Sequence, residues 1–175
     1  MRFELAKCQC VICAIVLLCS VSCSKVQKPS DLPDLFPTTI TIVQEGQPVE
    51  KATVNLLPEG NSKWFAGGLT NAQGVCKVRT QGKYDGAPVG KYDVVVYKTS
   101  ILESETRKQP VPSDPVEAKA YYDKVAKEEK FFDSIELKYK KPTTTDLKIE
   151  IVAGKNEQKF DVGKPVNIEF VPPLM

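Results

Sequence analysis

Cysteine and histidine content limits the chemistry that this chain can perform. The sequence has six cysteines and no histidine, so it lacks the side chain that most often acts as a general base or a zinc ligand. Only Cys23 and Cys76 lie outside the first twenty residues; the other four are Cys8, Cys10, Cys13 and Cys19. Two distant thiols cannot form a metal cluster. We therefore expect no cofactor, and any metal would need oxygen ligands, as calcium does.

The segment before Cys23 has the composition of an export signal. A positively charged start precedes a short apolar run at residues 11–19, and small residues then lead to Cys23. This order resembles a bacterial lipoprotein signal, in which the cysteine becomes the lipidated first residue, although such signals usually carry Leu where this chain has Ser20. Ordinary cleavage after Ser22, which would give a plain secreted protein, and an uncleaved anchor are the alternatives. The apolar run is too short for a stable transmembrane helix.

The lipoprotein interpretation divides the chain into three parts. Residues 1–22 are the signal peptide, residues 23–37 are a Pro-rich polar tether, and residues 38–175 form one domain. Lipid on Cys23 would hold the protein on a membrane of the bacterial cell envelope, on its periplasmic or surface side. The whole chain has a net charge of +2, and removal of residues 1–22 leaves a nearly neutral protein. We therefore expect no nucleic acid partner.

Motifs of common enzymes are missing from the sequence. It has no G-x-S-x-G, H-E-x-x-H or G-x-G-x-x-G pattern, and its carboxylates are scattered. Residues 86–91 resemble a phosphate-binding loop only faintly, because a strand follows where a helix is required. Cys76 lies in an alternating segment on the same strand face as Val78, which favours a buried thiol. The sequence therefore predicts a protein that is not an enzyme.

Aromatic residues provide the candidate binding surface. Trp64, Phe65 and Tyr84 would form a platform for a sugar if they reached one rim, although aromatic residues in strands more often pack in a core. Tyr121 and Tyr122 would either cover a sheet or contact a protein. The segment Ser100-Ile101-Leu102 is a further exposed candidate loop.

Period-two alternation of apolar and β-branched residues predicts a chain made mainly of strands. We expect seven to nine short strands, arranged as a single antiparallel β-sandwich. The expected strands cover residues 38–43, 52–57, 64–70, 75–80, 91–98, 134–139, 147–152, 157–162 and 166–171. A β-turn is expected at residues 71–74 and a hairpin turn at 154–156. The strand at 91–98 is apolar on both faces, so it should lie centrally, partly under a helix.

One amphipathic helix is expected within an insertion at about residues 114–132. Asp114 is the expected N-cap, Pro115 fits the first helical position, and Glu117 would close a capping box. The helix should extend over about residues 115–131 and pack on the domain through one face. The residues of that face are Val116, Ala120, Tyr121, Val125, Glu128 and Phe132.

Short motifs between residues 45 and 96 resemble a known domain family. These motifs are Glu45-Gly46-Gln47-Pro48-Val49, Thr70-Asn71-Ala72-Gln73-Gly74 and Gly86-Ala87-Pro88-Val89-Gly90-Lys91-Tyr92. They resemble the carboxypeptidase regulatory-like, transthyretin-like domains of bacterial envelope lipoproteins, over roughly residues 40–162. The resemblance implies an Ig-like β-sandwich, and it specifies fold better than function because the motifs are mainly turns.

Together these features predict a non-catalytic, lipid-anchored module of the cell envelope, with a structural or protein-binding role. Its expected partners are the membrane, through Cys23, and an envelope protein. A carbohydrate-binding module, or a plain secreted protein of the same fold, is the alternative, and a glycan would then be the ligand.

Overall fold

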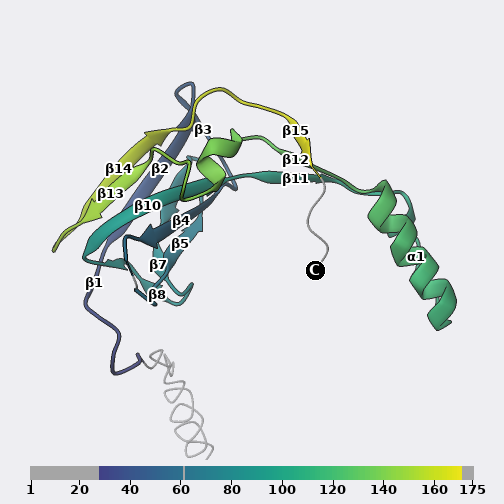
Figure 1. Cartoon of the computed structure of the whole chain (residues 1–175), viewed down its shortest axis with the longest axis horizontal. Coiled ribbons are helices and arrows are strands. Elements are labelled where there is room, and N and C mark those ends of the chain that lie inside the picture. Colours follow the sequence, from purple (N-terminus) through teal and green to yellow (C-terminus); the bar gives the residue numbers. More distant parts are fainter. Residues whose placement is uncertain (1–27, 61, 171–175) are drawn as a thin grey trace, which may run out of the picture.

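The computed structural model describes residues 28–60 and 62–170, and the chain is mainly β in this part (Figure 1). The largest sheet has six antiparallel strands in the order β13-β10-β4-β5-β7-β8. These strands are β4 (Thr53–Pro58), β5 (Ala66–Leu69), β7 (Arg79–Thr80), β8 (Tyr84–Asp85), β10 (Gly90–Tyr97) and β13 (Lys148–Ile151). As predicted, the strongly apolar strand β10 lies inside the sheet.

A second sheet is built around β2 (Thr38–Gln44). This strand pairs antiparallel with β3 (Gln47–Pro48) and β6 (Val75–Lys77), but parallel with β14 (Asn156–Asp161). The expected all-antiparallel arrangement is therefore wrong at the β2–β14 pair. A short pair, β1 (Leu35–Phe36) with β9 (Ala87–Pro88), lies at the end of the body where the described chain enters.

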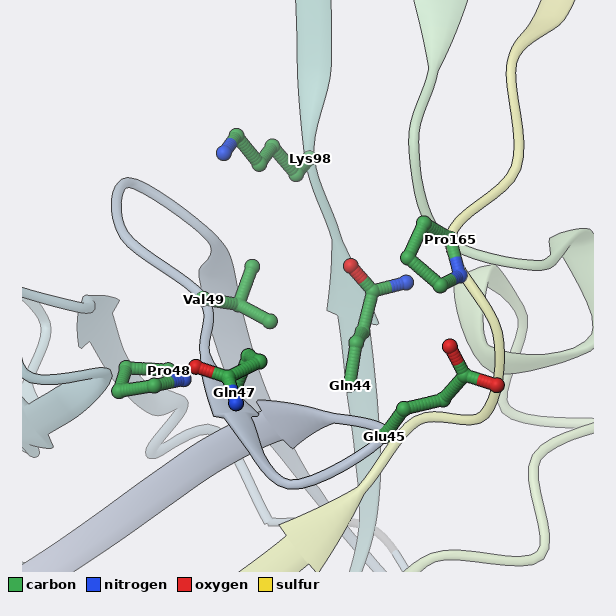
Figure 2. A pocket seen from close by; sticks show the side chains of 7 residues that line it. All are labelled: Gln44, Glu45, Gln47, Pro48, Val49, Lys98 and Pro165. Atoms are coloured by element: carbon green, nitrogen blue, oxygen red, sulfur yellow. The ribbon is translucent and has the colours of Figure 1, made fainter.

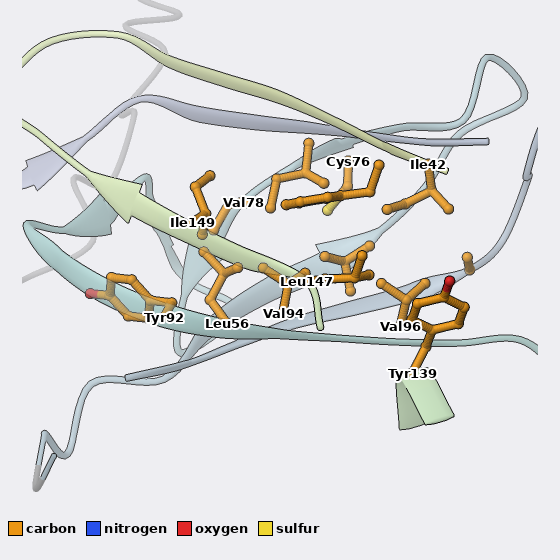
Figure 3. Packing of buried hydrophobic residues seen from close by; sticks show 14 of the residues in the cluster. Ile42, Leu56, Cys76, Val78, Tyr92, Val94, Val96, Tyr139, Leu147 and Ile149 are labelled. Atoms are coloured by element: carbon orange, nitrogen blue, oxygen red, sulfur yellow. The ribbon is translucent and has the colours of Figure 1, made fainter. Parts of the chain in front are cut away.

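One hydrophobic core joins side chains from both sheets (Figure 3). Alternate residues of β2, Ile40 and Ile42, are fully buried, and Val94 and Val96 of β10 are buried in the same cluster. This alternation follows from the strand geometry, which turns every second side chain to the same face. Tyr92 completes the β10 face, and its hydroxyl donates to the carbonyl oxygen of Pro88 at 2.8 Å.

The predicted turn at residues 71–74 is confirmed, and it shows why a glycine ends it. The Asn71 side-chain oxygen accepts hydrogen bonds from the backbone N–H of Gln73 (3.0 Å) and of Val75 (2.9 Å). Gly74 has φ +72°, and a Cβ there would lie 2.4 Å from the carbonyl oxygen of Ile42. A side chain at this position would therefore push β6 away from β2.

Residues 99–133 form an extended excursion that we call the arm. It consists of β11 (Thr99–Leu102), the 3-10 helix η2 (Thr106–Lys108), the helix α1 (Pro115–Glu128) and β12 (Lys130–Asp133). β12 pairs with β11 on one side and with β15 (Ile168–Phe170) on the other. Figure 1 shows that α1 stands at the far end of the arm, away from both sheets of the body.

Several sequence expectations are wrong at the arm and near the C-terminus. The helix ends at Glu128 because residues 130–133 pair as β12, and it does not pack on the sheets. The expected strand at 134–139 is instead a bend followed by the 3-10 helix η3 (Leu137–Lys140), which contacts β10 where α1 was expected. The turn at 154–156 is no hairpin, because β13 and β14 belong to different sheets.

The incoming chain and the arm leave the body at opposite ends. β2 begins at Thr38, directly after the expected tether, and it ends at Gln44. Ser134 is the residue that directly follows β12. Its carbonyl oxygen accepts a hydrogen bond from the Gln44 side-chain amide at 3.0 Å. Seven residues of strand span roughly 20 Å. The arm therefore starts about one strand length away from the point where the chain enters.

Candidate interaction surfaces

The three-stranded sheet of the arm carries an apolar row. Its register places Ile101, Phe131 and Phe170 side by side on one face, and the two phenylalanine rings lie 6.0 Å apart. Ile101 remains 53% exposed and Leu102 60% exposed. Large exposed apolar side chains on a projecting element are typical of a surface that another molecule covers.

A partly buried ion pair connects the arm to the body. Asp133 is 1% exposed, and its carboxylate accepts from the Thr99 hydroxyl at 2.8 Å and from the Lys140 ammonium at 2.6 Å. Lys140 belongs to η3, so this bond connects the body with β12. The same ammonium lies 4.2 Å from the centre of the Phe170 ring, which is a cation–π geometry. These contacts connect the base of the arm to η3 of the body.

The end of the arm is held by contacts between η2 and α1. The Tyr121 hydroxyl donates to the carbonyl oxygens of Arg107 (3.2 Å) and Gln109 (3.3 Å), and Val125 is buried beside η2. Arg107 also forms an ion pair with Glu129, and the hydrogen bond from its guanidinium to that carboxylate raises the pKa of Arg107. Tyr121 is therefore a structural residue of the arm.

The outer surface of α1 is open. The Asp114 carboxylate caps the helix as predicted, accepting from the N–H groups of Val116 (2.9 Å) and Glu117 (3.1 Å). Val116 is 78% exposed, and Ala120 and Glu128 are exposed as well, so the predicted face was wrong at these three residues. Phe132, which was also predicted for this face, lies in β12. Tyr122 is 56% exposed, and its ring meets Tyr121 edge-on at 5.2 Å. Of the two predicted tyrosines, Tyr122 is the more exposed, whereas Tyr121 is half-buried.

The structure separates the three aromatic residues of the expected sugar platform. Trp64 and Tyr84 are only 9% and 8% exposed, whereas Phe65 is 56% exposed. Phe65 borders a shallow groove of about 340 Å³ on the outer face of β5, together with Leu69 and Arg79. Gly67 forms part of the groove lining. An aromatic ring beside polar side chains is one element of a carbohydrate site, and Phe65 supplies that ring in this groove.

A second hollow lies where the arm joins the body (Figure 2). Its volume is about 270 Å³, and its described lining residues are Gln44, Glu45, Gln47, Pro48, Val49, Lys98 and Pro165. Glu45 and Lys98 are the ionisable residues among them, and Figure 2 shows their side chains on opposite sides of the hollow. This lining offers neither a nucleophile with an adjacent base nor a pair of carboxylates.

The thiol of Cys76 is packed in the core, as the sequence predicted. The residue is fully buried, and a Cβ added to Gly68 would lie 3.0 Å from its sulfur. Burial raises the pKa of Cys76 to about 11, because the thiolate is disfavoured away from water. Among the described residues, no three or more His, Cys, Asp and Glu side chains form a group that could hold a metal ion.

Sequence reasoning identified the exposed segment 100–102 but missed what surrounds it. The Asp133–Lys140 pair was not predicted, because Asp133 fell between the expected helix and the expected strand at 134–139, and Lys140 fell directly after that strand. The available sequence signals for these strands were the Phe131-Phe132 pair in β12 and the alternation of Ile168 and Phe170 in β15. The register that pairs β12 with β15 is not encoded locally in either segment.

Cys23 lies outside the described residues. In the part of the chain that the structure describes, no helix has the length and apolar character needed to cross a membrane. Comparisons with protein-family models, with curated proteins and with solved structures give no match. The function must therefore be argued from the geometry of this chain alone.

Proposed function

We propose that this protein is a non-catalytic, lipid-anchored module of the bacterial cell envelope that binds another protein through its arm. In this proposal the body is a transthyretin-like β-sandwich, and lipid on Cys23 attaches it to a membrane. The single observation that carries the protein-binding role is the projecting arm, which presents Ile101, Leu102, Val116 and Tyr122 to solvent.

The core of the body supports a separate role for the arm. None of the described members of the main hydrophobic cluster belongs to residues 99–133, and the cluster is completed by residues before and after the arm. The arm therefore adds little to the burial that stabilises the body. An ordered element that contributes little to the core, but carries exposed apolar side chains, is best explained as a binding element.

The sandwich interpretation rests on the shared core. Side chains from β2, β6 and β14 meet side chains from β4, β10 and β13 in one cluster, which is the arrangement expected of two sheets packed face to face. The parallel pairing of β14 with β2 and the arm itself are departures from the antiparallel pattern that we expected.

Matched single substitutions test the binding role. Tyr122→Ala and Phe65→Ala remove aromatic rings of equal exposure, 56% in each case, one on the arm and one on the body. Affinity capture from native envelopes, quantified by mass spectrometry, should lose its specific protein with Tyr122→Ala and keep it with Phe65→Ala. Equal capture by wild type and Tyr122→Ala, or loss only with Phe65→Ala, would refute binding through the arm.

A carbohydrate-binding role is the second candidate, and the groove beside Phe65 is the observation that favours it. Trp64 is the single tryptophan of the chain and precedes Phe65, so its fluorescence should report a glycan bound there. A titration with a panel of envelope polysaccharides that changes the Trp64 signal in wild type, but not in Phe65→Ala, would support this candidate. An unchanged signal with every glycan would remove it.

A further inference from the structure

β11 is an unprotected sheet edge. It ends the sheet β11-β12-β15, and all four of its residues, Thr-Ser-Ile-Leu, are exposed. Each other edge strand of three or more residues in the described chain contains at least one charged residue; these strands are β6, β13, β14 and β15. Charges on an edge discourage pairing with another chain. β11 lacks this protection.

The backbone of β11 has hydrogen-bonding groups that face away from β12. The N–H of Ser134 donates to the carbonyl oxygen of Lys98 at 3.0 Å, so this opposed pair is a hydrogen-bonded one. Bonded and non-bonded pairs alternate along an antiparallel ladder. Ser100 and Leu102 therefore bond to β12, whereas Thr99 and Ile101 direct their N–H and C=O groups outward.

We propose that β11 pairs antiparallel with β11 of a second copy of this chain, with Ile101 opposite Ile101 across a two-fold axis. The inference rests on the proposed function, because it makes the arm a contact element. In this register the outward groups of both strands meet. The row formed by Ile101, Phe131 and Phe170 then continues into its equivalent in the second copy, and Leu102 lies opposite Ser100.

The charges at the ends of β11 favour this direction of pairing. Lys98 precedes the strand and Glu103 follows it, so an antiparallel arrangement brings the cationic end of one copy near the anionic end of the other. A parallel arrangement would bring like charges together. The arm projects from the body in Figure 1, which gives a second arm access to the edge.

The size of the contact determines where the dimer forms. A four-residue edge buries less than the roughly 1,000 Å² expected of a stable interface. The pairing should therefore be weak in dilute solution and should become populated when lipid anchors concentrate the protein on a membrane, which raises its effective concentration.

Disulfide trapping tests the pairing in the lipidated full chain. Ile101→Cys places two thiols across the axis at a Cα separation of about 5.5 Å, which suits a disulfide. Phe65→Cys is the matched control, because Phe65 is 56% exposed and Ile101 is 53% exposed. In phosphatidylethanolamine–phosphatidylglycerol vesicles treated with copper–phenanthroline, Ile101→Cys should give at least ten times more disulfide dimer than Phe65→Cys. Equal yields would overturn the proposal.

A second variant separates backbone pairing from chance collision. Ile101→Pro removes an outward N–H and leaves the bonds to β12 in place. Energy transfer between donor- and acceptor-labelled copies in the same vesicles should fall at least fivefold with Ile101→Pro and stay unchanged with Val152→Ala, which removes a side chain that is 54% exposed on the body. The Trp64 emission spectrum verifies folding of each variant. Unchanged transfer with Ile101→Pro would refute β11 pairing. If energy transfer is unchanged with Ile101→Pro while envelope capture still depends on Tyr122, the dimer proposal fails and the proposed binding function of the arm stands.

Discussion

Breaking the ion pair at the base of the arm should produce a measurable coupling energy. Asp133 is almost fully buried, whereas the Lys140 side chain is 31% exposed to solvent. Removing one partner of a fully buried pair costs about 3–5 kcal/mol. Because water reaches Lys140, we expect about 2 kcal/mol for Lys140→Met, which leaves the Asp133 carboxylate with the Thr99 hydroxyl only.

Replacing the acidic partner of the pair should lower the free energy of unfolding by less than Lys140→Met does. Asp133→Asn keeps an acceptor for Thr99 and leaves a Lys140 ammonium that can turn to water, so we expect about 1 kcal/mol, typical of one lost hydrogen bond. The double variant should then be more stable than the sum of the single effects predicts, with a coupling energy of at least about 1 kcal/mol.

Urea unfolding followed by Trp64 fluorescence measures the stability of the body, and amide hydrogen exchange at residues 131–133 measures the arm itself. Lys138→Met is the control, because Lys138 lies in the same 3-10 helix but its ion-pair partner Asp146 is 3.8 Å away and exposed. Lys138 also lies 4.5 Å from the centre of the Tyr139 ring, a contact that the methionine side chain retains in part. This control should cost less than about 0.5 kcal/mol. A coupling energy near zero, with exchange at 131–133 unchanged, would show that the arm is not held by this pair.

Three further predictions concern the core, the groove and the anchor. Because burial raises the pKa of Cys76 from 9.0 to about 11, the unfolded thiol ionises first, and wild type should lose about 2 kcal/mol relative to Cys76→Ala between pH 9 and 11. Parallel pH profiles in chemical denaturation would contradict this. Gly67→Ala should destabilise the body by more than about 2 kcal/mol, because the added Cβ would lie 2.4 Å from the carbonyl oxygen of Val54. An unchanged melting temperature would be inconsistent with that contact. Cys23→Ala should abolish labelling with a palmitate analogue; persistent labelling would show that the lipid is attached elsewhere.

The sequence predicted those elements whose signals are local. Alternation of apolar residues located β2, β4 and β10, and the Asp114 cap located the start of α1. It failed where the outcome depends on distant partners. The strands on either side of Gly154 were expected to pair, but each finds a better neighbour elsewhere: β13 bonds to β10, and β14 bonds to β2.

The same distinction explains the candidate surface. Trp64 and Phe65 are adjacent and precede β5, yet Trp64 is buried while Phe65 is 56% exposed, and their order in the sequence does not predict which of the two is covered. The helix pattern predicted an apolar face that packs on the domain, but another element of the arm covers part of that face instead. That covering element is η2, which is a single turn and therefore too short to give a periodic sequence pattern. It leaves Val116 and Tyr122 exposed on the arm.

Site-specific photo-crosslinking in native envelopes tests most directly whether the arm is the binding element. A benzophenone amino acid would be placed at Tyr122 on α1 and, for comparison, at Phe65 on the body, which has the same exposure. The proposed function predicts a discrete protein adduct from position 122 and none from position 65. Adducts from position 65 alone, or no adduct from position 122 in an envelope that contains the lipidated protein, would contradict binding through the arm.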